Sequence, residues 1–339
     1  MLDIQSAVSL QTMNTLALSA SAEYCCRVVS LEMLQEALGW ARDKRLQVTV
    51  LGGGSNVILA DDIPGLVIAM AIPGMTLDRQ QAEQCLVRVG AGENWHQLVL
   101  NTLSQGWFGL ENLSLIPGLA GAAPIQNIGA YGVELSEHFH SLDAIHINTG
   151  EPVTLSAEDC RFAYRDSFFK HAGRDQYVIT SLVLSLSTQP SLRLDYPALQ
   201  QAIEQRNLSS VTPEVVSQVV CDIRRSKLPD PRDIPNVGSF FKNPVMSAEQ
   251  AKHLQRDFPD VVSYPQADGR VKLAAGWLVD QAGWKGVSLS HVGVHQQQAL
   301  VLTNRGGNSE ELLALANDII RSVQSKFAVT LELEPRVYP

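Results

Sequence analysis

Apolar residues recur at helical spacing in several stretches of the chain. Between positions 30 and 45, Leu31, Leu34, Leu38 and Ala41 fall on one face of a helix. Ser30 stands where a helix is usually capped, so the pattern predicts a helix over 30–45. The same spacing predicts helices over 93–104, 213–224, 247–258 and 309–325.

Short apolar runs bounded by Gly and Pro predict strands between these helices. They cover 48–51, 57–60, 66–70, 86–89, 141–147 and 177–186. The C-terminal stretch 329–334 alternates, with Val329 and Leu331 facing one way and Glu332 and Glu334 the other. We therefore expect a final strand there, and an α+β protein with a soft domain boundary within 187–225.

Glycine gathers in three segments that separate the predicted elements. Gly52-Gly53-Gly54, followed by Ser55 and Asn56, joins one strand to the next. Gly90-Ala91-Gly92 follows a strand and precedes a helix, and 106–134 contains six glycines. Main chain without Cβ atoms can approach a phosphate closely, so three such surfaces suit an extended diphosphate ligand. Tight turns and independent structural glycines are the alternative explanation.

The glycine run matches neither common nucleotide motif. It lacks the Lys of a P-loop, and Val57 occupies the place of the third glycine of a dinucleotide fingerprint. No helix is predicted directly after it.

Composition narrows the class of protein further. The 339 residues carry 26 Lys and Arg against 35 Asp and Glu, a formal charge of −9. An acidic chain without a basic run argues against nucleic acid or an anionic membrane as partner. The five cysteines form no C-x-x-C pair, so we expect neither a disulfide framework nor a cysteine zinc site. No metal site is expected at His138, His140 and His146, because no carboxylate or thiol completes a ligand set.

Several long strings resemble one enzyme family. They are Leu51-Gly52-Gly53-Gly54-Ser55-Asn56, Val89-Gly90-Ala91-Gly92-Glu93-Asn94-Trp95, Gly109-Leu110-Glu111-Asn112-Leu113 with Ile116-Pro117-Gly118, and Pro124-Ile125-Gln126-Asn127-Ile128-Gly129-Ala130-Tyr131-Gly132. Together they resemble the UDP-N-acetylenolpyruvoylglucosamine reductase (UDP-N-acetylmuramate dehydrogenase) family, over nearly the whole chain. The segment Leu194-Asp195-Tyr196 is similar to the tyrosine loop of the family's longer, type I form.

The resemblance implies a fold and a domain order. It implies an FAD-binding domain of the vanillyl-alcohol-oxidase (PCMH) type and a smaller α/β substrate-binding domain. We expect the FAD-binding domain in 1–187, a connecting segment with the tyrosine loop in 188–225, and the substrate-binding domain in 226–325. Residues 326–339 are expected to form a C-terminal strand with the catalytic glutamate.

The resemblance also implies the ligands and the reaction. FAD is held non-covalently, NADPH is the co-substrate, and UDP-N-acetylglucosamine enolpyruvate is reduced. The expected FAD contacts are Gly52, Gly53, Gly54, Ser55, Asn56, Gly90, Gly92, Pro117, Gly118, Gln126, Asn127, Gly129 and Ala130.

Three catalytic residues are implied by the family's strings. Arg165 lies in Tyr164-Arg165-Asp166-Ser167 and would stabilise charge on the substrate carboxylate. Ser239, in Val237-Gly238-Ser239-Phe240, would donate a proton to the substrate. Glu334 matches the family's glutamate, although Pro335 replaces the usual aliphatic residue after it, and Glu332 is the alternative. A carboxyl that assists beside the intermediate has to be protonated.

The remaining polar matches point to the substrate. The expected contacts are Tyr131, Tyr196, Arg224, Lys227, Asn243, Lys272, Lys285 and Gln298. We expect a cytoplasmic enzyme, because the n-region and h-region of a secretory signal are missing. We also expect a monomer. Two alternatives stay open: an oxygen-using oxidase of the same flavin fold, and a redox-inert protein that binds a nucleotide sugar.

Overall fold

A computed structural model describes residues 2–339 and divides the chain into two compact units. Neither unit is continuous in sequence. Unit 1 contains 1–8, 22–53 and 63–226, and unit 2 contains 9–21, 54–62 and 227–339. The boundary between units therefore falls inside the glycine run, between Gly53 and Gly54.

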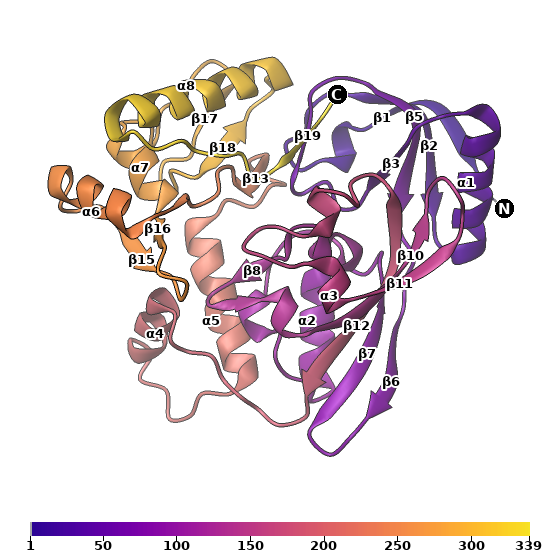
Figure 1. The fold of residues 1–339 in the computed structure, drawn as a ribbon, viewed down its shortest axis with the longest axis horizontal. Helices are drawn as coiled ribbons and strands as arrows, with labels where there is room; N and C mark the ends of the chain where they lie inside the picture. Colours follow the sequence, from indigo (N-terminus) through magenta and orange to yellow (C-terminus); the bar gives the residue numbers. More distant parts are fainter. Residues whose placement is uncertain (1) are drawn as a thin grey trace. The chain divides into compact units, whose positions relative to one another are not determined.

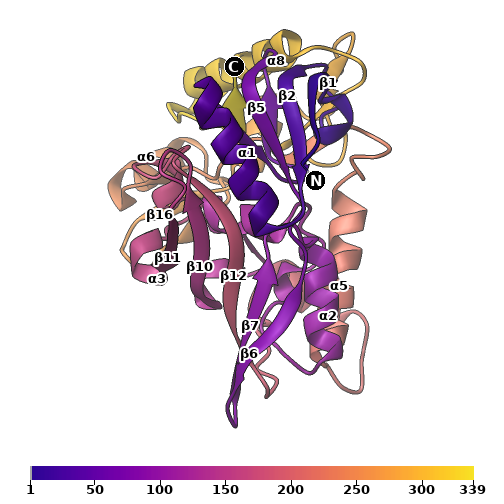
Figure 2. The same ribbon diagram turned by 90° about the vertical axis from the view of Figure 1, so that its right-hand side faces the viewer.

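The first sheet of unit 1 has parallel strands at its centre. Its order is β1 (Ile4–Ser9), β2 (Ser21–Val28), β5 (Ile63–Met70) and β3 (Val48–Leu51). Both β2 and β3 pair with β5 in parallel. Helix α1 (Leu31–Lys44) begins where Ser30 accepts the N–H of Met33, and it lies along β2 and β5 in both views (Figures 1 and 2). The predicted helix is confirmed.

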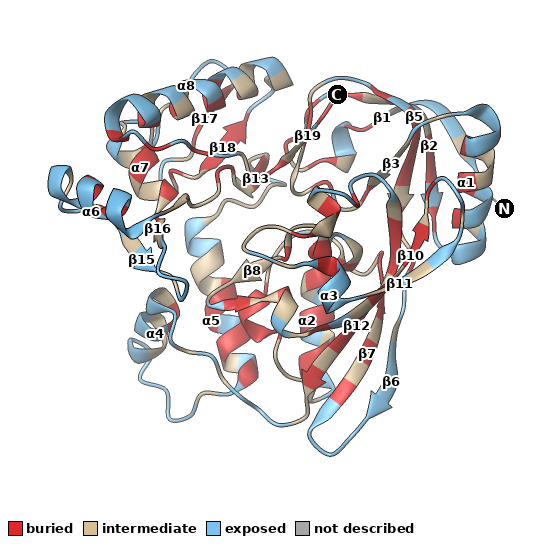
Figure 3. Cartoon of the chain, viewed as in Figure 1, coloured by how far each residue is buried: buried red, intermediate tan, exposed pale blue. Residues whose placement is uncertain are grey.

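The second sheet of unit 1 is antiparallel and carries the larger core. Its strands, in spatial order, are β11 (Pro152–Ser156), β10 (Phe139–His146), β12 (Tyr177–Ser187), β7 (Gln84–Gly90) and β6 (Met75–Gln80). Figure 3 shows β12 and β7 largely buried and β6 exposed at the edge. Helix α2 (Trp95–Ser104) packs on this sheet through Trp95, which is 1 % exposed.

The glycine-rich stretch 106–134 contains no α-helix, as predicted. It forms 3-10 turns at Glu111–Leu113 and Ala120–Gln126 and a small hairpin of β8 (Gly129–Ala130) and β9 (Val133–Glu134). A further 3-10 turn follows at Leu135–Glu137, and another at Phe168–Lys170. The remaining helices that begin in unit 1 are α3 (Ala157–Cys160), α4 (Pro197–Glu204) and α5 (Pro213–Lys227).

Unit 2 is built around its own core, with three helices and short sheets. The helices are α6 (Ala248–Asp257), α7 (Ala275–Gln281) and α8 (Ser309–Phe327). One sheet orders β13 (Asn236–Ser239), β18 (Val301–Asn304) and β17 (Val292–Val294), and another orders β14 (Val245–Met246), β16 (Val271–Leu273) and β15 (Ser263–Pro265). A turn at Gln11–Met13 and strand β4 (Val57–Leu59) join this unit from the first part of the chain.

The strand predicted over 329–334 is wrong. The segment is extended, but its only pairing is one isolated bridge between Leu333 and Phe241. The last strand is β19 (Arg336–Tyr338), which follows Pro335 and pairs in parallel with β4. The predicted facing is right, because Val329 is buried and Glu332 is exposed. Alternation reports the two faces of an extended segment, and it cannot report whether another strand supplies hydrogen bonds.

We expect Gly92→Ala to destabilise unit 1. A Cβ atom at this position would lie 2.3 Å from the main-chain carbon of Ala71. Such overpacking costs about 1–3 kcal/mol of unfolding free energy, measured by urea denaturation. The control is Gly39→Ala in α1, where the nearest atom would be 3.9 Å away and helix propensity predicts a small gain. Equal stability of both variants would contradict the close packing at Gly92.

Candidate functional site

The three glycine segments come together within unit 1. A Cβ atom on Gly53 would lie 3.0 Å from the Cα atom of Gly118. The N–H of Gly121 donates to the carbonyl of Ala91 at 2.9 Å, which joins the third segment to the second. The three segments therefore pack main chain against main chain at these two places.

Gly90 and Gly92 are glycines because of packing. Cβ atoms there would lie 2.5 Å from the carbonyl oxygen of Ile72 and 2.3 Å from Ala71. Their own N–H groups already donate to the carbonyls of Gly74 and Ile72, both at 2.8 Å. The N–H groups of these two residues are therefore already used within the protein, and their predicted contact with FAD stays a prediction.

The rest of the glycine run belongs to unit 2. Gly54 has φ +60°, and a Cβ atom there would lie 2.0 Å from the carbonyl oxygen of Met13. Ser55 and Asn56 form the turn before β4, and the carbonyl of Asn56 accepts the N–H of Arg336 at 3.0 Å. The C-terminal strand thus begins against the predicted cofactor loop.

Asn127 is fully buried and organises the end of the third segment. Its Nδ2 donates to Glu134 at 2.7 Å, and its Oδ1 accepts the N–H of Ser136 at 2.9 Å. Its φ of +46° suits Asn better than most residues. The side chain is thus occupied in holding the β8–β9 hairpin, where the predicted contacts Gly129 and Ala130 lie. The other two, Pro117 and Gln126, lie just before Gly118 and at the end of the 3-10 turn Ala120–Gln126.

Arg165 lies at the tip of a two-residue turn. Ala163 and Asp166 exchange main-chain hydrogen bonds at 3.1 Å on either side of it, and its φ is +52°. The guanidinium donates to the carbonyl of Gly129 at 2.7 Å. The turn therefore directs this cation to the β8–β9 hairpin.

Tyr131 connects the predicted substrate residues of unit 1. Its ring meets that of Tyr196 edge-on, with centroids 5.3 Å apart. The guanidinium of Arg224 lies close enough for its charge to act on Tyr131, although burial is the main cause that raises the pKa of this tyrosine. Burial likewise lowers the pKa of Arg224, and the charge of Arg165 adds to that effect. Two cations and two tyrosines therefore share one region, which suits an anionic ligand. Lys227 lies at the exposed end of α5.

Ser239 and Glu334 come together in unit 2. Ser239 ends β13, and the next residue, Phe240, accepts the N–H of Glu334 at 3.0 Å. Glu334 is half-buried, whereas the alternative Glu332 is exposed and pairs with Lys242 at 3.2 Å. The geometry thus favours Glu334 as the carboxyl beside the serine.

Three further predicted residues gather around the start of α7. Asn243 accepts the N–H of Ala275 at 2.9 Å, and Gln298 lies beside Gly276, where a Cβ atom would be 3.6 Å from its Oε1. Lys272 pairs with Val245 across β16 and β14, two residues beyond Asn243. Lys285, by contrast, forms an ion pair with Asp280 at 3.1 Å. The negative charge of Asp280 weakens the attraction of Lys285 for a phosphate.

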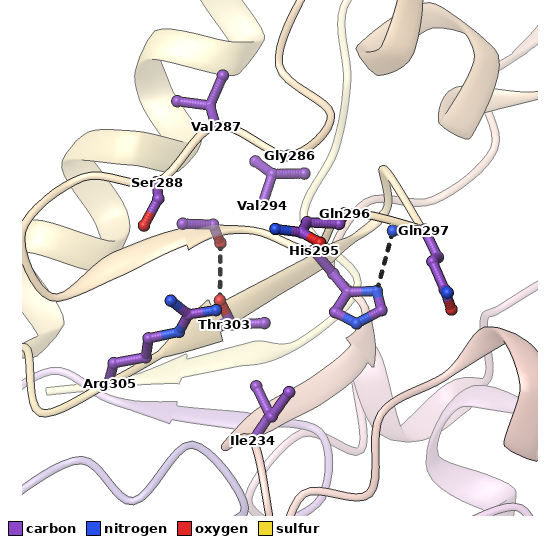
Figure 4. A pocket seen from close by; sticks show the side chains of 11 residues that line it. Ile234, Gly286, Val287, Ser288, Val294, His295, Gln296, Gln297, Thr303 and Arg305 are labelled. Carbon is purple, nitrogen blue, oxygen red and sulfur yellow. Dashed lines mark hydrogen bonds between the residues drawn. The ribbon is translucent and has the colours of Figure 1, made fainter.

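Unit 2 also contains a pocket of about 250 Å³ that the sequence did not indicate (Figure 4). Its lining includes Ile234, Val287, Ser288, His295 and Arg305. The Nδ1 of His295 accepts the N–H of Gln297, so the proton of the neutral ring is on Nε2. His295 and Arg305 are ten residues apart and meet through the hairpin of β17 and β18, which the strand predictions missed.

We also searched the described residues for metal sites, disulfides and membrane-spanning helices. No three His, Cys, Asp or Glu side chains of residues 2–339 are arranged to hold a metal ion. All five cysteines are buried thiols, so no disulfide is present. Within the same residues no helix is long and apolar enough to cross a membrane.

Comparison with known proteins is decisive about the family. A model of the C-terminal domain of UDP-N-acetylenolpyruvoylglucosamine reductase matches residues 230–338, and an FAD binding domain model matches 22–156. The chain is 49 % identical over 329 residues to the UDP-N-acetylenolpyruvoylglucosamine reductase of Paraburkholderia xenovorans, covering 96 % of this chain and 95 % of that protein. The chain belongs to the UDP-N-acetylenolpyruvoylglucosamine reductase family.

Further matches agree with that membership. The reductase of Pseudomonas aeruginosa is 47 % identical over 338 residues, with 99 % of both chains covered. The crystal structure of the Thermus caldophilus reductase aligns over 100 % of both chains with a TM-score of 0.68 and 23 % identity, which supports the fold. The predicted family, the FAD-dependent oxidoreductase class and the α+β fold with a flavin domain are confirmed.

The residues of unit 1 fit FAD. A flavin dinucleotide carries a diphosphate, and Gly53 and Gly118, which lie against each other, carry no Cβ atoms that would keep a phosphate from the main chain. Gly52 precedes Gly53, and a Cβ atom there would meet Ala122 at 3.7 Å. The N–H groups of Gly90 and Gly92 are used within the protein, so Gly52, Gly53 and Gly118 are the glycines that fit a diphosphate best.

We expect Asn236→Ala to weaken the loop that carries Ser239. Asn236 is 2 % exposed, accepts the N–H of Gly238 at 2.8 Å and donates to the carbonyl of Ile234 at 2.8 Å. Removal of this amide leaves its buried hydrogen-bond partners unsatisfied, which costs about 1–3 kcal/mol of unfolding free energy. Urea denaturation measures this loss. Ser263→Ala, which removes only an exposed hydrogen bond to Gln255, is the control. A loss no larger than that of the control would contradict the role of Asn236.

Proposed function

We propose that this chain reduces UDP-N-acetylglucosamine enolpyruvate to UDP-N-acetylmuramate, a precursor of the bacterial cell wall, with NADPH as electron donor. The observation that carries the proposal is the main-chain hydrogen bond from Glu334 to Phe240, the residue that follows Ser239, in a chain whose family membership is established. FAD, when bound, would supply the hydride chemistry that this reduction needs.

Ser239 is proposed as the proton donor. When the methylene carbon receives a hydride, negative charge moves through the double bond toward the substrate carboxylate. The reaction is complete when a proton is added at the α-carbon, and a hydroxyl group in contact with that carbon can deliver it. Ser239 is half-exposed at the end of β13, with the flexible Gly238 (φ +72°) before it, so its hydroxyl is accessible to a ligand.

Arg165 and Glu334 are proposed to stabilise the developing charge. A guanidinium fits a carboxylate through two parallel hydrogen bonds and stays charged at all working pH values. The turn at Arg165 holds this group with its main chain constrained, so little reorganisation is needed as charge develops. Glu334, if protonated, donates a hydrogen bond to the same intermediate.

Two sets of residues, each described within its own unit, are proposed as contacts for the nucleotide part of the substrate. In unit 1 these are Tyr131, Tyr196 and Arg224, which lie together, with Lys227 at the end of the same helix. In unit 2 they are Asn243, Lys272 and Gln298, around the start of α7. NADPH is proposed to use the same cations in its turn, because both ligands carry a diphosphate.

The division of labour follows the sequence prediction. We propose FAD binding for 1–187, connection for 188–225, and substrate binding for 226–325 together with 326–339. A monomer in the cytoplasm, without nucleic acid or membrane partners, is part of the proposal. Five reduced, buried cysteines and a net charge of −9 support it.

The first test separates the two halves of the reaction. Purified Ser239→Ala protein should lose its yellow colour with NADPH under anaerobic conditions as fast as the parent. On addition of the enolpyruvyl sugar nucleotide, its colour should return at least about 100-fold more slowly, because the proton donor is missing. Return at the parental rate would disprove the role of Ser239. Rapid oxygen consumption by the reduced parent, without substrate reduction, would favour the oxidase alternative.

The second test compares two glutamates. Glu334→Gln should lower turnover by about 100-fold, because an amide is a much weaker acid than a carboxyl group and donates a weaker hydrogen bond to the charged intermediate. Glu332→Gln removes only an exposed ion pair with Lys242 and should keep turnover within about twofold. If the two results are reversed in a steady-state NADPH assay, Glu332 takes the role.

A further inference from the structure

We propose that His96 is a positioning residue for Arg224, and that it acts through the peptide group of Leu115. The proposal rests on the proposed function, in which Arg224 binds the anionic part of the substrate. His96 does not itself contact the substrate; it fixes the place of the guanidinium that does.

The connection is a chain of two hydrogen bonds within unit 1. The N–H of Leu115 donates to Nδ1 of His96 at 3.0 Å, and the carbonyl of Leu115 accepts Nε of Arg224 at 3.1 Å. One residue therefore joins the imidazole on α2 to the guanidinium on α5. Arg224 has no carboxylate partner among residues 2–339, so this carbonyl is what orients it.

The backbone conformation of Leu115 is not one that its own side chain favours. Its φ is +58°, in the left-handed region that a bulky side chain rarely adopts. The preceding hydroxyl, of Ser114, is within 2.7 Å of the hydroxyl of Ser217 on α5, and both residues are buried. Contacts to α2 and α5 therefore hold a peptide that would otherwise relax.

The imidazole can do this only when it is neutral. As acceptor at Nδ1, it carries its proton on Nε2, which lies 3.9 Å from Sγ of Cys221. The charged and titratable groups that act on His96 come from α5: Arg225 and Arg224, with the Cys221 thiol in contact. Burial first, and then these two arginines, lower the pKa of His96, which keeps the acceptor available at neutral pH.

Two substitutions distinguish the acceptor from the bulk of the ring. In His96→Asn, Oδ1 takes the place of Nδ1 and can accept the N–H of Leu115, whereas the longer His96→Gln places its amide near Nε2. With the FAD-loaded enzyme, we expect His96→Gln to raise the KM for UDP-N-acetylglucosamine enolpyruvate about tenfold, with kcat within about twofold. His96→Asn should keep the KM within about twofold of the parent. Equal KM values for parent and His96→Gln would overturn the proposal.

A pH profile gives a second readout that needs no loss-of-function variant. Protonation makes the imidazole a donor at both nitrogens, and the pKa of His96 is lowered by burial and by the two arginines. The parent's KM should therefore rise only at a pH below the ordinary histidine pKa of about 6.5. The rise should be absent in His96→Asn, which has no titrating group at this position. Parallel profiles for the two proteins would overturn the proposal.

Arg224→Ala separates this inference from the proposed function. If Arg224→Ala raises the KM and His96→Gln adds nothing further in the double variant, the two residues act as one unit. If Arg224→Ala raises the KM but His96→Gln alone does not, the positioning role fails while the substrate site stands. If Arg224→Ala leaves the KM unchanged, the proposed role of Arg224 fails, and the inference fails with it.

Discussion

Two main-chain hydrogen bonds hold the end of the chain against the serine loop. Lys242 donates to the carbonyl of Glu332, and Glu334 donates to that of Phe240. Bonds of this kind fix register, since a slip by one residue would turn every side chain to the opposite face. Phe240 and Phe241, at 0 % and 1 % exposure, anchor the register from the core side. These bonds place Glu334 next to Phe240 and Glu332 next to Lys242.

Unit 1 brings the three glycine segments into contact with one another. The glycines at 90 and 92 let the main chain of 71–73 approach, and their amides are used inside the protein. The glycines at 53 and 118 face one another instead. Glycine in a sequence thus has two uses, close packing of main chain on main chain and a bare surface for a ligand.

The sequence predicted the elements well where periodicity was long. All five helices exist within three residues of their predicted ends, because each buries a stripe of several turns. The strand predicted over 329–334 was wrong. The residues that pair with β4 lie after Pro335, which has no N–H to donate. The hydrogen bonds of Asn127 and His96 could not be predicted from the sequence either. Each bond joins residues that only the folded chain brings close.

The discontinuity of unit 2 has a consequence for how the chain is made. Strand β4 is synthesised early, yet its partner β19 consists of residues 336–338. The nearby contact of Asn56 with the carbonyl of Glu334 joins positions 278 apart. At ribosomal speed the whole chain takes roughly 20–70 s, and for most of that time the exposed edge of β4 has nothing to pair with. Unit 2 therefore cannot complete its pairing of β4 until residues 336–338 have been synthesised.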